Sequence, residues 1–354
     1  MNKMPLYLDS ASTTPVDPRV IEAMLPYFSE IFGNASSNHI YGKQAKNAIE
    51  VAREQVAKLI NADNKEIIFT SGATESINLA IKGFVEANMD KGKHIITVKT
   101  EHKAVLATCE YLETKGFEVT YLDVDENGLV LLDELTSAIT NNTLLIAVMY
   151  VNNEIGVIQP ISEIGKIALN HNICFFCDAT QAIGKIKVDV EIDNIDMLCF
   201  SGHKLNGPKG IGVLYKKNNL ELIPLFHGGG QENGLRPGTY NTPLIVGLGK
   251  ACEIITHEID ENISNLLEKR NELENYYEKN NVGLVNFKHV KRAPHILSIT
   301  LNEMDADEFL MLKAKDFTAS TGSACNSSII ELSHVITSLQ INNPKNILRI
   351  SINQ

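Results

Sequence analysis

Between residues 67 and 201, short apolar segments alternate with amphipathic segments of helical period, and this alternation limits the folds available to the chain. The apolar segments have the length of single strands, and the segments between them are long enough for helices of about 10–15 residues. The expected strands span residues 67–70, 94–98, 118–122, 143–151, 173–177, 197–201 and 211–215, and the expected helices span 73–87, 102–115, 131–139 and 161–170. Such an alternation is typical of a parallel sheet covered by helices on both faces. We therefore expect an α/β fold with a mostly parallel sheet.

Two of the expected strands have no polar face. Residues 144–148 (Leu-Leu-Ile-Ala-Val) and 173–177 (Ile-Cys-Phe-Phe-Cys) are apolar at every position, as in strands that are covered on both sides. The pair Cys174 and Cys177 has the spacing of a redox motif. On a strand, however, residues i and i+3 point to opposite faces, so we expect both cysteines in the core.

The composition changes after residue 249. Around this point a charged segment, residues 245–280, carries apolar residues along one side. A coiled-coil dimer is one interpretation, but the heptads do not persist, which favours a single helix that joins two domains. At 354 residues the chain is also long for one hydrophobic core. We expect a large domain over residues 15–250 and a small domain built from residues 1–14 and 251–354. Within the former, residues 19–32 and 43–60 are predicted to be amphipathic helices.

Charge and composition exclude several classes of protein. The formal net charge of −11 argues against direct binding of nucleic acid, which requires basic surfaces. No run of 18 apolar residues predicts a membrane span, and residues 1–5 lack the apolar core of a signal peptide. Six cysteines in a chain of this size fit a reducing compartment better than a disulfide framework. We therefore expect a cytoplasmic protein.

Polar side chains follow five of the expected strands. They lie in residues 70–75, 100–103, 152–154, 178–181 and 201–204. Because the carboxyl ends of parallel strands meet at one edge of a sheet, and ligands of open α/β sheets bind there, we expect these side chains to share one site.

This edge offers the groups that pyridoxal phosphate requires. Lys204 lies between two apolar runs, where loss of solvent favours the neutral amine that attacks an aldehyde. Asp178 offers a carboxylate to the pyridinium nitrogen, and residues 70–75 offer hydroxyls and free helix amides to a phosphate. Each residue also has an ordinary interpretation, as a solvated lysine in a hairpin or a helix cap. Their coincidence at one edge favours a cofactor site.

Nine segments in a fixed order carry a resemblance to a known family. They are residues 7–9, 69–76, 100–105, 151–156, 178–181, 201–204, 227–232, 236–239 and 321–325. The chain resembles the class I cysteine desulfurases, the NifS/IscS family of pyridoxal phosphate enzymes, nearly from end to end. The resemblance implies the fold type I of PLP-dependent transferases, with a mostly parallel seven-stranded sheet domain and a smaller α+β domain that carries a catalytic cysteine loop.

The resemblance also implies a role for each residue of the site. Lys204 forms a Schiff base with the cofactor and moves the substrate's α-proton, and Asp178 keeps the ring nitrogen protonated. His102 stacks on the ring and acts in proton transfer, and Asn153 and Gln181 lie beside the ring, with Gln181 at its phenolic oxygen. Contacts to the phosphate are implied for Ala73, Thr74, Ser201, His203 and, from a partner subunit, Thr239. Arg349, together with Asn153, pairs with the substrate carboxylate.

Cys325 is implied as the sulfur acceptor, and the residues around it, 320–328, are small and polar, which favours an accessible thiol. The implied reaction converts L-cysteine to L-alanine and leaves a persulfide on Cys325 for a sulfur-acceptor protein, in iron–sulfur cluster assembly or in tRNA or DNA thiolation. No group of His and Cys has the spacing of metal ligands, so no metal is expected. The remaining cysteines lie in apolar helix or strand patterns and are expected in the core: Cys109, Cys174, Cys177, Cys199 and Cys252.

The resemblance further implies a homodimer. Ala35 stands where the family's loop usually has proline, and Asn206 where the lysine loop usually has an aromatic residue. Relatives continue past the Arg349 strand with a further helix, whereas this sequence stops at Gln354, so that helix is expected to be absent. Two alternatives stay open: another fold-type-I enzyme, such as a selenocysteine lyase or an aminotransferase, and a non-catalytic binding partner on a desulfurase scaffold. Cys325 argues against the first, and the intact set of Lys204, Asp178 and His102 argues against the second.

Overall fold

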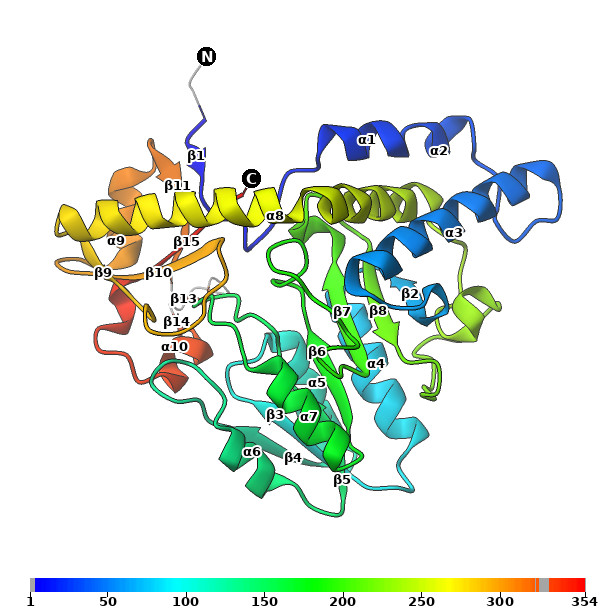
Figure 1. Ribbon diagram of the computed structural model, residues 1–354, viewed down its shortest axis with the longest axis horizontal. Helices are drawn as coiled ribbons and strands as arrows, with labels where there is room; N and C mark the ends of the chain where they lie inside the picture. The colour runs from blue at the N-terminus through cyan, green and yellow to red at the C-terminus, as the bar shows by residue number, and fades with distance from the viewer. Residues whose placement is uncertain (1–3, 322, 325–330, 354) are drawn as a thin grey trace.

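The computed structural model describes residues 4–321, 323–324 and 331–353, and Figure 1 shows their arrangement. A seven-stranded sheet forms the centre of the larger part of the molecule, in the order β2-β8-β7-β6-β5-β3-β4. Its strands are β2 (Ile67–Thr70), β3 (His94–Val98), β4 (Glu118–Leu122), β5 (Thr143–Ala147), β6 (Cys174–Asp178), β7 (Met197–Ser201) and β8 (Gly212–Lys216). Neighbouring strands from β7 to β4 run parallel, whereas β8 runs antiparallel to both β2 and β7. The expected mostly parallel sheet is confirmed.

Adjacent residues of the central strands enter different apolar cores because they point to opposite faces of the sheet. On β6, Phe175 and Cys177 pack in one core, whereas Cys174 and Phe176 pack in the other. The first face is covered by α3 (Ile40–Ile60), α6 (Leu132–Ala138), α7 (Ile161–Asn170) and the first half of α8 (Thr242–Lys279), and the second by α4 (Ala73–Ala87) and α5 (Lys103–Glu113). The predictions of a doubly covered sheet and of two core cysteines on β6 are confirmed.

A smaller antiparallel sheet lies at the other end of the molecule, in the order β12-β15-β10-β9. Its strands are β9 (Gly283–Val285), β10 (Ile296–Leu301), β12 (Ser320–Thr321) and β15 (Ile347–Ser351). The shorter elements around it are β1 (Leu6–Tyr7) paired with β11 (Phe317–Thr318), β13 (Ser323–Ala324) paired with β14 (Glu331–Leu332), and the helices α9 (Ala306–Lys313) and α10 (His334–Ser338). The sheet and its helices agree with the expected smaller α+β part. The residue boundaries of the two domains stay a prediction.

The 38-residue helix α8 connects the two parts and extends across the molecule in Figure 1. Leu248 and Ile255 pack in the core of the large sheet, whereas Leu266 and Tyr277 pack beneath the small sheet. The prediction of one continuous helix is therefore confirmed, and this helix packs in both cores. Among the helices of the described residues, α8 included, none is both long and apolar enough to cross a membrane.

The predicted helix over residues 19–32 is wrong in its length and in its buried face. The chain forms α1 (Pro18–Met24) and a separate short α2 (Pro26–Ser29). Pro26 has no N–H to continue the hydrogen-bond ladder of α1, so the helix ends before it. Of the four residues that the helical pattern placed on one face, Ile21, Leu25 and Phe28 are 45%, 58% and 62% exposed, and only Met24 is buried.

A buried ion pair holds the loop that follows β8 against the large sheet. Arg53 of α3 donates from Nη1 and Nη2 to the two carboxylate oxygens of Glu232, at 2.9 and 2.7 Å. The Glu232 carboxylate also accepts the Phe69 N–H of β2 at 2.9 Å. Glu232 and Asn233 both have positive φ values, 47° and 56°, which residues other than glycine rarely adopt. The ion pair therefore fixes this loop in an unusual backbone conformation.

Candidate active site

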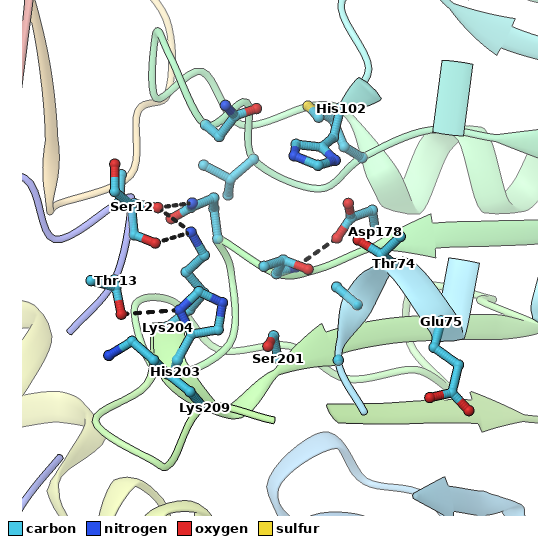
Figure 2. A pocket seen from close by; sticks show the side chains of 18 of the residues that line it. Ser12, Thr13, Thr74, Glu75, His102, Asp178, Ser201, His203, Lys204 and Lys209 are labelled. Atoms are coloured by element: carbon cyan, nitrogen blue, oxygen red, sulfur yellow. Dashed lines mark hydrogen bonds between the residues drawn. The ribbon is translucent and has the colours of Figure 1, made fainter. Parts of the chain in front are cut away.

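A cavity of about 740 Å³ opens at the carboxyl edge of the large sheet, where the sequence predicted a site. Figure 2 shows it from close by. Ten of the predicted residues line it: Ala73, Thr74, His102, Asn153, Asp178, Gln181, Ser201, His203, Lys204 and Arg349. Thr239 does not line the cavity of its own chain and is exposed on the loop after β8. Cys325 lies outside the described residues.

The N-terminal segment forms a wall of the cavity that the sequence did not predict, through Ala11, Ser12 and Thr13. This segment contacts both parts of the molecule. On one side, the N–H of Ala11 donates to Ser351 Oγ of β15 at 2.9 Å. On the other, the N–H of Thr14 donates to the carbonyl of His203 at 2.9 Å. The hydroxyls in the segment 10–14 offered a weak signal, but nothing local indicates that this segment contacts both sheets.

Lys204 projects into the cavity from η2 (Gly202–Lys204), the short turn that follows β7. Its Nζ donates to the backbone carbonyls of Ala11 and Ser12, the latter at 2.7 Å (Figure 2). Burial and, to a smaller extent, the nearby Arg349 lower the pKa of Lys204 from 10.5 to about 8, although Asp9 and Asp178 oppose the change. At neutral pH roughly a tenth of this amine is therefore uncharged, against well under a thousandth for an ordinary lysine.

The turn between β2 and α4 has the form of a phosphate cradle. Gly72 adopts φ 156° and ψ 178°, a conformation open to glycine, and α4 begins at the next residue. A side chain at Gly212 of β8 would lie 2.5 Å from the Gly72 Cα, so two glycines allow the turn to lie against the sheet. Free amides at the start of a 15-residue helix, with Thr74 and Ser201 beside them, suit an anion.

The acidic residue of this first turn does not oppose an anion in the cradle. Glu75 accepts the Ser71 N–H at 2.7 Å and the Arg236 Nε–H at 3.0 Å, and Figure 2 shows its carboxylate pointing away from Lys204. Burial raises the pKa of Glu75, but the hydrogen bonds from Arg236 and Ser71 outweigh burial and lower it overall. His203, beside the cradle, stays neutral, because burial and then Lys204 lower its pKa to about 4.

Asp178 and His102 lie across the cavity from Lys204 (Figure 2). Asp178 ends β6, is buried, and accepts the Thr180 N–H at 2.9 Å through Oδ1. His102 caps α5, with its Nδ1 accepting the Ala104 N–H at 3.1 Å. An accepting Nδ1 carries no proton, so the neutral ring presents N–H at Nε2. Burial lowers the pKa of His102, with Asp178 opposing the change.

Arg349 reaches the cavity from β15, the interior strand of the small sheet with β10 and β12 on its two sides. Its Nη1 donates to the carbonyl of Asn153 at 2.9 Å, and its Nη2 lies 2.7 Å from Asp9 Oδ1. A guanidinium has five N–H groups, so these contacts leave donors for a ligand while fixing the position of the side chain. The structure thus brings Arg349 and Asn153 together, as predicted.

The donor set fits pyridoxal phosphate. One cavity is lined by a lysine with a lowered pKa, a buried carboxylate opposite it, a flat imidazole and an amide cradle. Each of these groups matches a different part of that cofactor. No group of three or more His, Cys, Asp or Glu side chains in the described part of the chain could hold a metal ion. The fold and this cavity define a pyridoxal phosphate enzyme of fold type I.

Comparison with known proteins gives the family. The model of the class-V aminotransferase family matches residues 6–354. The cysteine desulfurase IscS of Methanosarcina thermophila is 51% identical over 333 residues, 94% of this chain and 82% of that protein. IscS of Neisseria meningitidis serogroup C is 51% identical over 340 residues, 95% of this chain and 84% of that protein. The chain belongs to the class-V aminotransferase family and, within it, to the cysteine desulfurases.

Solved structures agree with this assignment. A NifS-like protein superposes with a TM-score of 0.92 at 37% identity, over 99% of this chain and 94% of that one. A structure described as SspA in complex with cysteine gives a TM-score of 0.85 at 40% identity, over 98% of this chain and 99% of that one. The resemblance inferred from the sequence motifs is therefore confirmed, as are the fold and the cofactor that it implied.

The lowered pKa of Lys204 predicts how the cofactor-free protein captures pyridoxal phosphate. The neutral amine is the nucleophile, so the capture rate should be low below pH 7 and rise with pH around a midpoint near 8. Stopped-flow absorbance over a pH series measures this midpoint. Arg349→Gln removes a charge that lowers this pKa, so it should move the midpoint upward. A midpoint near 10 in the parent protein would contradict the prediction.

Proposed function

We propose that this chain removes the sulfur of L-cysteine, releases L-alanine, and holds the sulfur as a persulfide on Cys325 for an acceptor protein. The observation that carries this proposal is the single cavity that combines Lys204, Asp178, the cradle at residues 71–74 and the Arg349 guanidinium. The names of the relatives, cysteine desulfurase and a protein in complex with cysteine, support the choice of substrate.

The bound cofactor would supply an electron sink for the electron pair that leaves the substrate α-carbon. Lys204 would hold the cofactor covalently and then carry the α-proton, a task that suits an amine with a pKa of about 8. Asp178 would keep the ring nitrogen protonated, and the His102 ring would stack on the cofactor. Gln181 would lie at the phenolic oxygen.

Neutral donors and helix amides would hold the phosphate. Ala73 and Thr74 offer the first amides of α4, and Ser201 and His203 offer side-chain donors from the end of β7. At neutral pH the His203 ring is uncharged, so it would contribute a hydrogen bond rather than a charge.

The sulfur transfer balances without an external oxidant. The Cys325 thiolate would attack the substrate sulfur and form an S–S bond, while the Cβ–S bond of the substrate breaks. The electron pair of that bond stays on Cβ, which takes a proton and becomes the methyl group of alanine. The substrate sulfur is oxidised and the substrate carbon is reduced, so Cys325 ends as a persulfide.

Arg349 and Asn153 would bind the substrate carboxylate. The two residues already contact each other through Arg349 Nη1 and the Asn153 carbonyl, and Asp9 and Ser320 fix the other side of the guanidinium. A ligand carboxylate could take the second N–H of Nη1 without disturbing these contacts.

We also propose that the protein is a homodimer in which Thr239 contacts the phosphate in the partner's site. Thr239 is exposed in its own chain, on the loop that the Arg53–Glu232 ion pair fixes. Large apolar side chains are also exposed in the segments around α1, α2 and the start of α3 and on the loop after β8: Leu25, Phe28, Phe32, Ile40 and Phe226. A surface of this kind marks a protein interface more often than free solvent.

The homodimer proposal predicts complementation between two defective chains. Lys204→Ala and Thr239→Ala chains, each impaired as homodimers, should together form mixed dimers in which one site has both native residues. Light scattering should give the mass of two chains, and mixing should restore up to about half the parent activity per repaired dimer. An active monomer, or no restoration in isolated mixed dimers, would contradict the proposal.

Cys325→Ala tests the sulfur acceptor. The variant should bind pyridoxal phosphate with the parent affinity, whereas alanine release from L-cysteine should fall by more than about a hundredfold. Cys177→Ala is the matched control: this core thiol should cost about 1 kcal/mol of stability and leave turnover unchanged. Alanine and sulfide are measured together. Turnover by Cys325→Ala near the parent rate would mean that another thiol accepts the sulfur.

Arg349→Ala tests the carboxylate site. Loss of a charge-assisted contact should raise KM for cysteine roughly tenfold to a hundredfold while the bound cofactor content stays constant. Arg349→Lys keeps the charge but not the paired donors of the guanidinium, so its KM should lie between those of the parent and Arg349→Ala. Steady-state kinetics with parallel absorbance spectra check both variants. An unchanged KM in Arg349→Ala would place the substrate carboxylate elsewhere.

A further inference from the structure

Behind the cavity wall, a buried histidine that the sequence did not single out contacts Gln181. His295 directly precedes β10 and is 1% exposed. Its Nε2 lies 3.2 Å from Gln181 Oε1. On its other side, Gln181 Nε2 donates to the backbone carbonyl of Ala11 at 2.9 Å. These two contacts decide which way the Gln181 amide faces.

The chemistry of the partners allows one arrangement of protons. The Ala11 carbonyl can only accept, so the amide group that faces it is the NH₂ of Gln181. The amide oxygen then faces His295, and because that oxygen can only accept, Nε2 of His295 carries a proton. Burial and then the nearby cation Lys185 lower the pKa of His295 well below its usual value, so the ring is neutral. Its Nδ1 is buried, unprotonated, and without a hydrogen-bond partner in the described part of the chain.

The position of His295 is fixed from outside the cavity. Its carbonyl accepts the Ile352 N–H at 2.9 Å, beyond the end of β15. Nearby, the Ala293 N–H donates to the carbonyl of Gly156 at 2.8 Å. The ring is therefore held by the small sheet, whereas the glutamine that it contacts belongs to the large sheet. The distance between His295 and Gln181 therefore depends on how the small sheet packs against the large sheet.

We propose that His295 is a positioning residue that fixes Gln181 as a hydrogen-bond donor toward the cavity. The NH₂ of Gln181 has two N–H groups, and the bond to Ala11 uses one of them. Because Gln181 lines the cavity, the second N–H is available to an acceptor there, and the ionised phenolic oxygen of pyridoxal phosphate is such an acceptor. This inference rests on the proposed function, which places Gln181 at that oxygen.

Without a donor at residue 295, the amide oxygen loses its partner and the amide can turn. A turned amide presents its oxygen both to the Ala11 carbonyl and to the cofactor oxygen, and repels both. The hydrogen bond from the second N–H of Gln181 would stabilise negative charge on the phenolic oxygen. Loss of that bond therefore raises the proton affinity of the bound cofactor. The visible absorption band of the holoenzyme should then titrate at a higher pH.

The tautomer of His295 is tested in the cofactor-free parent protein. Two-dimensional ¹H–¹⁵N spectra that correlate ring protons with ring nitrogens should show Nε2 of His295 protonated and Nδ1 unprotonated across pH 6–8. The peaks are assigned as those missing from His295→Gln. A protonated Nδ1 would overturn the proposal whether or not the protein binds the cofactor, which separates this test from that of the proposed function.

Two variants test the effect on the cofactor. His295→Leu removes the donor at similar volume, whereas His295→Gln can place an amide N–H near the position of Nε2. In His295→Leu, the pKa of the absorption band should rise by about 0.5 to 1 and pyridoxal phosphate affinity should fall about two- to tenfold, the effect of one neutral hydrogen bond. His295→Gln should stay within about twofold of the parent affinity.

Ser298→Ala is the matched control. Ser298 lies on β10, the strand that begins directly after His295. It is buried, and its hydroxyl accepts a hydrogen bond from Asn286 at 3.1 Å. Loss of this bond weakens β10 away from the cavity. This variant should be less stable than the parent without any change in the absorption band. An unchanged band in His295→Leu would overturn the proposal, as would equal shifts in the Leu and Gln variants or a shift in Ser298→Ala.

Discussion

One residue of the N-terminal segment, Ala11, connects the parts of the active site. Its carbonyl accepts hydrogen bonds from Lys204 and Gln181, which follow β7 and β6 of the large sheet. Its N–H donates to Ser351 on β15, the strand that also carries Arg349. These three bonds join residues that are 193, 170 and 340 positions apart in the chain. Lys204, Gln181 and Arg349 are therefore placed relative to one another only when both sheets are packed.

Burial and nearby cations lower the pKa values of three residues in and beside the cavity. Lys204, His203 and His295 all have lowered pKa values, with loss of solvent as the largest cause and a nearby lysine or arginine as the next. The histidines are consequently neutral donors at physiological pH, and the lysine keeps a usable fraction of free amine. Arg349, in contrast, forms an ion pair with Asp9, which lies 2.7 Å from its guanidinium. A permanent charge is thus paired, whereas the Lys204 amine, with a pKa of about 8, has no carboxylate as a hydrogen-bond partner in the described part of the chain.

The spacing of apolar residues predicted the central sheet, and the polar residues that follow its strands predicted most of the residues that line the cavity. The apolar runs at 144–148 and 173–177 required cover on both faces, and alternate residues of β6 do enter two different cores. The same reasoning failed for residues 19–32, where Pro26 breaks the helix and the apolar side chains of Ile21, Leu25 and Phe28 are exposed. A local pattern reports that a face is apolar, but not whether a sheet or another molecule covers it.

The sequence by itself determined the fold class, the edge of the sheet that carries the site, and the residue types that match the cofactor, because each depends on local period or on the ends of strands. Only the tertiary structure decided that Ala11 to Thr13 form a cavity wall, that Arg349 is held by Asp9 and Asn153, and that His295 orients Gln181. Those contacts join segments from opposite ends of the chain. No spacing in the sequence encodes them, since their geometry arises from the packing of the two sheets against each other.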